Sequence, residues 1–190
     1  ITFGLGLPLL LVVVFLLISG LPALFVAPPQ YDVLYATQYP HQQQGLQITV
    51  VDKKVQVHYQ GNVRNARNPR IWRFTPSTGS VTEVFIVLPS SLTGSSSKKS
   101  TEEELLKITQ IDVPDLEGLL INSSSIAADG YEFTVGANGS SRNILGGLFS
   151  SHRYRTKAFL SKSGRSVRLP NSNTSYYRSN TRFIGWVVGQ

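Results

Sequence analysis

The chain has 190 residues and a formal net charge of +7, and it contains neither cysteine nor methionine. The absence of cysteine excludes disulfides, thiolate metal sites and a cysteine nucleophile. The length allows one domain with its own hydrophobic core, and we expect residues 28–190 to form it.

The first 27 residues contain no charged side chain and consist mainly of Leu, Val, Ile and Phe. About 20 apolar residues cross a hydrocarbon core of roughly 30 Å, so residues 1–27 predict a transmembrane helix. A signal peptide would have a shorter apolar region of about 7 to 15 residues, and a buried core helix is rarely apolar on all faces. Gly4 and Gly6 are candidate contacts for a second membrane helix, because small residues let helices approach closely; ordinary membrane-helix glycines are the alternative.

The charges after this segment indicate an orientation. The first basic residue beyond it is Lys53. Because Lys and Arg near a membrane helix tend to stay cytoplasmic, we expect the large domain to be exported. In a bacterium this means a single-pass protein of the inner membrane with a periplasmic domain. Since the sequence has no methionine, we also expect a short leader before Ile1.

Short β-type runs broken by turn residues follow from residue 31 onward. Residues 31–37, 46–51 and 53–59 predict strands, and the alternation in the third gives it one polar face. Residues 70–88 predict a hairpin around a turn with proline and glycine. Residues 90–100 are of low complexity and predict a flexible linker.

A single helix is expected in the middle of the domain, over residues 101–108, where Thr101 and Glu104 have capping-box spacing. Strand signals resume at 121–136, 154–170 and 181–188. The fold class is therefore mainly β: an N-terminal transmembrane helix followed by an antiparallel β-meander or sandwich-like domain with one short helix. A propeller needs at least four blades of about 40 residues, which residues 28–190 barely hold.

Three phrases carry a resemblance to known sequences: PPQYDVLYAT at 28–37, AADGYEF at 127–133 and RFIGW at 182–186. In these the chain resembles a loose group of uncharacterised bacterial single-pass membrane proteins with an exported β-rich domain. The resemblance implies a protein of the bacterial envelope. It implies no activity and no site residues.

No constellation typical of catalysis or of a bound cofactor stands out. The histidines, His41, His58 and His152, are far apart and lack the spacing of zinc ligands. Asp112, Asp115 and Glu117 form an acidic cluster that has Ca²⁺-binding oxygens but not the ligand spacing of an EF-hand, so a solvated loop is favoured. We therefore expect no catalytic, cofactor or metal residues and no enzyme.

Positive charge is concentrated at the C-terminal end. Residues 133–190 carry a net charge of +9 without one acidic residue, whereas residues 1–132 carry −2. Such asymmetry predicts an anionic neighbour. Because an exported domain seldom meets nucleic acid, we favour acidic protein or anionic lipid headgroups over nucleic acid. The candidate docking residues are Arg153, Arg155, Lys157, Arg165, Arg168, Arg178 and Arg182.

These features predict a non-enzymatic accessory subunit of a larger membrane protein complex. One helix would anchor it among other membrane subunits, and the exported domain would cap or brace the complex. The alternative is a membrane-tethered binding module for glycan, peptidoglycan or anionic lipid, with an aromatic cleft that includes Trp72, Tyr176 and Tyr177. An exported hydrolase would need a nucleophile or a perturbed acid, and the sequence offers no candidate.

Overall fold

The structure is a computed structural model that describes residues 6–15, 25–39, 45–60, 69–89, 108–136, 155–172, 174–175 and 180–189. It is mainly β, with antiparallel pairings and one short 3-10 helix, as predicted. The elements are β1 (Asp32–Tyr39), β2 (Gly45–Val51), β3 (Lys54–Gln60), β4 (Arg70–Thr75), β5 (Ser80–Val84), β6 (Ile108–Ile111), η1 (Pro114–Leu116), β7 (Leu120–Asn122), β8 (Glu132–Gly136), β9 (Arg155–Lys162), β10 (Arg165–Arg168), β11 (Thr174–Ser175) and β12 (Asn180–Gly189).

The expected transmembrane helix over residues 1–27 is not supported. Residues 6–15 are helical, and at about 1.5 Å per residue they rise roughly 15 Å, half of a hydrocarbon core. Within the described ranges, every helix is too short to cross a membrane. Residues 1–5 and 16–24 lie outside those ranges.

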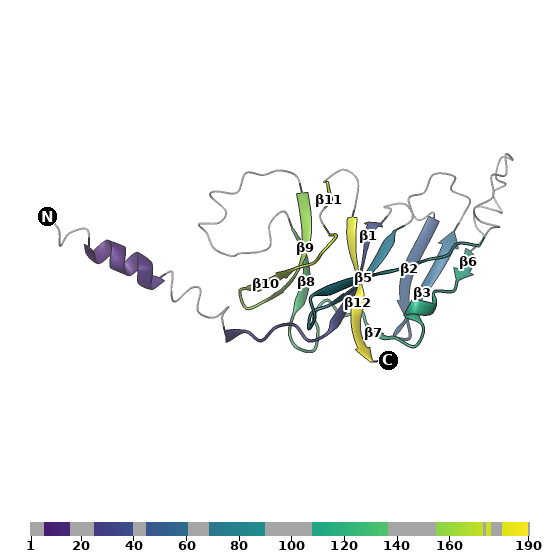
Figure 1. Cartoon of the computed structure of the whole chain (residues 1–190), viewed down its shortest axis with the longest axis horizontal. Coiled ribbons are helices and arrows are strands. Elements are labelled where there is room, and N and C mark those ends of the chain that lie inside the picture. Colours follow the sequence, from purple (N-terminus) through teal and green to yellow (C-terminus); the bar gives the residue numbers. More distant parts are fainter. Residues whose placement is uncertain are drawn as a thin grey trace.

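The strands form three sheets. The central sheet has the order β5-β4-β1-β12-β7, a second sheet combines β8, β9, β10 and β11, and a third has the order β2-β3-β6. One cluster of buried side chains joins the central sheet to β2, β3 and β6, and another joins it to β8 and β9. The central sheet therefore lies between the two smaller sheets, and the three sheets follow one another along the long axis of the molecule (Figure 1).

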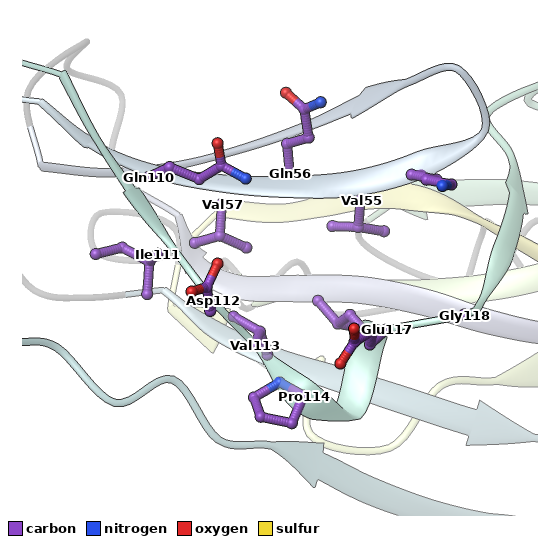
Figure 2. A pocket seen from close by; sticks show the side chains of 12 residues that line it. Val55, Gln56, Val57, Gln110, Ile111, Asp112, Val113, Pro114, Glu117 and Gly118 are labelled. Carbon is purple, nitrogen blue, oxygen red and sulfur yellow. The ribbon is translucent and has the colours of Figure 1, made fainter.

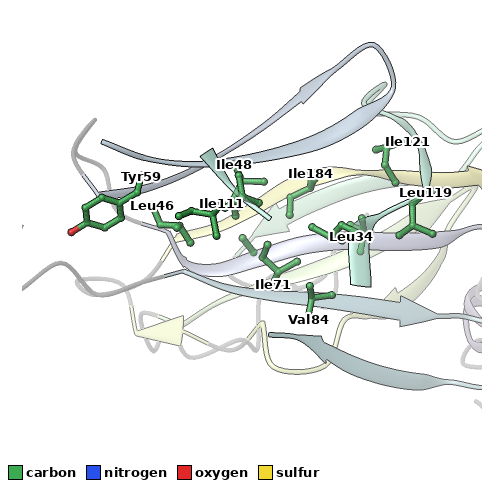
Figure 3. Packing of buried hydrophobic residues seen from close by; sticks show 13 residues of the cluster. Leu34, Leu46, Ile48, Tyr59, Ile71, Val84, Ile111, Leu119, Ile121 and Ile184 are labelled. Carbon is green, nitrogen blue, oxygen red and sulfur yellow. The ribbon is translucent and has the colours of Figure 1, made fainter. Parts of the chain in front are cut away.

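Both hydrophobic clusters depend on β1. Leu34 and Ala36 belong to the cluster shared with β2 and β3, whereas Val33 and Tyr35 belong to the cluster shared with β8 and β9. All four side chains are 0% exposed. Successive side chains of a strand point to opposite faces, so one strand supplies both cores. Figure 3 shows the first cluster, with Leu34 and Ile71 of the central sheet below the β2–β3 hairpin.

The last strand pairs with the first and changes face at a bulge. Leu34 pairs with Gly185 but Tyr35 pairs with Phe183, so Ile184 is an extra residue on β12. Because of this extra residue, Phe183 and Trp186, which are three positions apart, both lie on the side of the second cluster, whereas Ile184 joins the first.

Most strand predictions are confirmed, and the differences concern tertiary pairing. The domain is not a simple meander, because β1 lies between β4 and β12. The predicted strand that runs to residue 88 ends at Val84, which forms the last pair of the β4–β5 register with Ile71. Ile108, predicted as the end of a helix, begins β6 and pairs with Gln60. Residues 90–107, which include the predicted linker and most of that helix, lie outside the described residues.

Gly185 is the position on β12 where a side chain should be least tolerated. A Cβ added there would lie 2.2 Å from Ile121 Cγ2 and 2.9 Å from the carbonyl oxygen of Asn122. We expect Gly185→Ala to push β7 away from β12 and to lower the free energy of unfolding by about 1–3 kcal/mol, measured by urea denaturation.

Gly189→Ala on the same strand is the matched control. Its added Cβ would lie 3.3 Å from the flexible end of Leu120, which can move aside, so the loss should be much smaller. Equal losses in the two variants would show that the close approach of Ile121 and Asn122 does not set the requirement for glycine at residue 185.

Candidate functional site

The predicted docking cations whose side chains the structure describes are divided between two sheets. Lys157, Arg165 and Arg168 lie on the β9–β10 hairpin, and Arg182 is an exposed residue of β12 in the central sheet. The other predicted docking residues are Arg155, whose backbone lies in β9 and whose side chain is not among those described, and Arg153 and Arg178, which lie outside the described residues.

Even within the β9–β10 hairpin, the cations divide between two faces. Ala158 and Leu160 of β9 are buried in the core, so Lys157 points to the opposite, outer face. Arg168 pairs with Phe159 and shares that outer face, where it is exposed. Docking of these two cations to a partner or to lipid stays a prediction.

Arg165 has a different role, because it binds the chain that leads from the apolar segment into β1. Its Nη1 donates a hydrogen bond to the carbonyl oxygen of Val26 at 2.6 Å. The hydroxyl of Tyr131 donates to the carbonyl oxygen of Ala27 at 2.7 Å, and Tyr131 is fully buried. Val26 also packs against the second cluster, and Pro29 is buried. We call residues 25–31 the strap.

A turn at residues 127–131 holds the third contact to the strap. The Asp129 carboxylate accepts a hydrogen bond from the backbone N–H of Gln30 at 2.8 Å and another from the N–H of Tyr131 at 3.2 Å. The Lys162 ammonium donates to the carbonyl oxygen of Asp129 and lies 5.8 Å from the centre of the Tyr131 ring. Side chains that lie 99, 104 and 139 residues further along the chain therefore fix the strap at three backbone positions.

The strap continues into β1 through a charged contact. Nε of Arg73 lies 2.7 Å from the Asp32 carboxylate, which also accepts a hydrogen bond from the Thr75 hydroxyl at 3.0 Å. Asp32 is the first residue of β1. The attachment is thus continuous from residue 26 into the central strand.

Gly4 lies outside the described residues, and Gly6 lies in the helix of residues 6–15. A Cβ at Gly6 would meet no atom within 4 Å. Contact of these glycines with another membrane helix stays a prediction.

The other candidates from the sequence are placed as surface or core residues. Asp112, Asp115 and Glu117 are all exposed, which agrees with a solvated loop. His58 is half-buried on the polar face of β3, where its Nε2 lies 3.1 Å from the Thr49 hydroxyl. The structure assembles no cluster of three metal-ligating side chains among the residues that it describes. His41 and His152 lie outside that part of the chain.

Trp72, expected to line an aromatic cleft, is buried. Trp72 is 7% exposed, its indole N–H donates to the Thr37 hydroxyl at 2.9 Å, and the Arg70 guanidinium lies 4.6 Å from its ring centre. The two tyrosines expected beside it, Tyr176 and Tyr177, lie outside the described residues. Trp72 is therefore a core residue.

No protein-family model, curated protein or solved structure matches this chain.

The strap contacts involve residues that sequence reasoning did not single out for this purpose. Tyr131 and Asp129 were noted only within AADGYEF, and Arg165 only as one cation among several. The usable signal was the Asp-Gly pair followed by an aromatic residue, which is typical of a tight turn. Nothing in the sequence indicates that this turn binds residues 26–30.

Two buried tyrosines should make the domain sensitive to alkaline pH. Burial raises the pKa of Tyr35, whose hydroxyl donates to the Pro170 carbonyl at 2.5 Å, and burial also raises the pKa of Tyr131. Above about pH 10 tyrosines in the unfolded chain lose protons that the folded chain retains. The stability present below that pH is therefore lost as the pH rises.

We expect Tyr35→Phe to lower the free energy of unfolding at pH 7 by about 1 kcal/mol, because it removes one hydrogen bond. The same variant should lose less stability than the native protein between pH 9 and pH 11, measured by urea unfolding at each pH. If both proteins lose stability equally over this interval, Tyr35 does not contribute to the alkaline transition.

Proposed function

We propose that this protein is a non-enzymatic accessory subunit of a membrane protein complex, anchored through the apolar segment 1–27, with its β domain capping or bracing the other subunits. In a bacterium the domain would lie in the periplasm. The observation that carries the proposal is the fixation of the strap by Tyr131, Asp129 and Arg165.

The strap supports a bracing role because it fixes the chain that connects the apolar segment to the domain. A subunit that braces a complex must hold its domain in a defined position relative to its anchor. A free tether would allow the domain to rotate, whereas three hydrogen bonds to the backbone of Val26, Ala27 and Gln30 restrict that rotation. Phe25, just before these contacts, is 83% exposed, so an apolar side chain is presented where the domain begins.

A second candidate is a tethered module that binds anionic lipid. The exposed Arg168 and the partly exposed Lys157 favour it, because they share the outer face of the β9–β10 hairpin. A Lys or Arg close to an anionic membrane surface contributes about 1 kcal/mol. Two such residues give a weak attraction, which suits a supporting contact better than a primary function.

The test is isolation of the full-length protein from its native membranes in mild detergent, followed by mass spectrometry. We expect a stoichiometric set of membrane proteins to accompany it. A chain that is recovered alone at every detergent concentration would contradict the subunit proposal.

A pair of variants on one strand separates fixation of the strap from general positive charge. Arg165→Ala removes the bond to Val26, whereas Arg168→Ala removes the same charge from the outer face. We expect Arg165→Ala to reduce recovery of the partners by more than half and Arg168→Ala to change it little. An equal reduction in both would mean that charge, and not the strap, is what the partners require.

A further inference from the structure

A pocket of about 490 Å³ opens beside β3, between that strand and the loop at residues 112–118. β6 pairs with β3 as far as Ile111 opposite Val57. The chain then leaves β3, forms η1, and returns where the N–H of Ile121 donates to the Lys53 carbonyl at 2.7 Å. Figure 2 shows the loop bowed away from β3 with the pocket between them.

Val55 presents its backbone N–H and C=O on this side of β3. Val51 and Lys54 face each other across the two-residue turn of the β2–β3 hairpin, so the N–H and C=O of Lys54 point toward β2. The backbone groups of a strand alternate in direction, so those of Val55 point away from β2 and toward the pocket. No hydrogen bond joins them to the described residues of the loop.

The walls of the pocket are apolar and its rim is charged. The side chains of Val55 and Val57 point into it from β3, as Figure 2 shows, and Val113 and Leu116 line the opposite side. The exposed carboxylates of Asp112 and Glu117 and the ammonium of Lys54 stand at the rim and give it a net negative charge.

We propose that this pocket binds an extended peptide segment of a partner protein, with a small apolar side chain inside and basic residues beside it. The main chain of the peptide would exchange two hydrogen bonds with Val55. It would thus pair with the same edge of β3 with which β6 pairs from Val57 onward. Its apolar side chain would contact Val57 and Leu116, and its basic side chains would face Asp112 and Glu117.

This site does not rest on the accessory role proposed above. The strap and the β9–β10 hairpin lie toward one end of the long axis, and β3 and β6 lie toward the other (Figure 1). A domain held at the strap would consequently present the pocket at its far end. The peptide can therefore fail to bind even if membrane proteins co-purify with the chain, and it can bind even if none do, so the two proposals are tested separately.

The test uses the full-length, ¹⁵N-labelled protein in detergent micelles and the blocked peptide Ac-Lys-Thr-Val-Thr-Lys-NH₂, whose central valine would pair with Val55 and face the pocket. We expect saturable amide shifts at Val55, Ile111 and Val113. The same peptide with an N-methylated central valine, which cannot donate, and Ac-Glu-Thr-Val-Thr-Glu-NH₂, which has the wrong charge, should both bind at least several-fold more weakly.

Charge variants of the loop complete the test. Asp112→Asn combined with Glu117→Gln should weaken binding of the lysine peptide about fivefold or more. Asp115→Asn is the matched control, because Asp115 is exposed on the same loop but does not line the pocket. The affinity of this variant for the lysine peptide should stay within about twofold of the native value. The proposal is overturned by an absence of saturable shifts at millimolar peptide, or by equal binding of all three peptides.

Discussion

The structure depends on one strand that is buried on both faces. Four successive side chains of β1, from Val33 to Ala36, are fully buried, two in each hydrophobic cluster. The two smaller sheets pack on opposite sides of the central sheet, and β1, β4 and β12 contribute buried side chains to both clusters. Truncating a buried Leu or Ile typically costs about 2–5 kcal/mol, so damage to β1 would weaken both cores at once.

The strap extends this central strand toward the apolar segment. Residues 26–30 are fixed by the turn at 127–131 and by Arg165, and the next residues enter β1, where Asp32 is bound by Arg73. A displacement of the apolar segment would thus act directly on the strand that organises both cores. In the proposed accessory role this continuous connection would hold the domain in a defined position relative to the anchor. The pocket beside β3 lies at the opposite end of the domain from the strap (Figure 1).

The sequence predicted the local features of this fold, but it did not predict which strands pair with one another. Alternation of apolar and polar residues placed β3, and turn residues placed the β4–β5 and β9–β10 hairpins, because these signals act over a few residues. The pairing of β1 with β12 depends on packing between opposite ends of the chain, including the bulge at Ile184 and the close approach at Gly185. Charge composition located the cations, but it could not show that Arg165 binds backbone while Arg168 faces outward, since that depends on the register of β9 and β10.

We infer that the strap and β1 form one rigid element, and amide hydrogen exchange of the full-length protein can measure this rigidity. The amide of Gln30 donates to the Asp129 carboxylate, and the amides of Leu34 and Tyr35 lie in the central strand. We expect Gln30 to be strongly protected, and the Asp129→Asn variant to exchange faster at Gln30 while Leu34 and Tyr35 keep their protection. Exchange of Gln30 at the rate of an unprotected amide, with β1 still protected, would show a hinge at residue 30 and contradict the account.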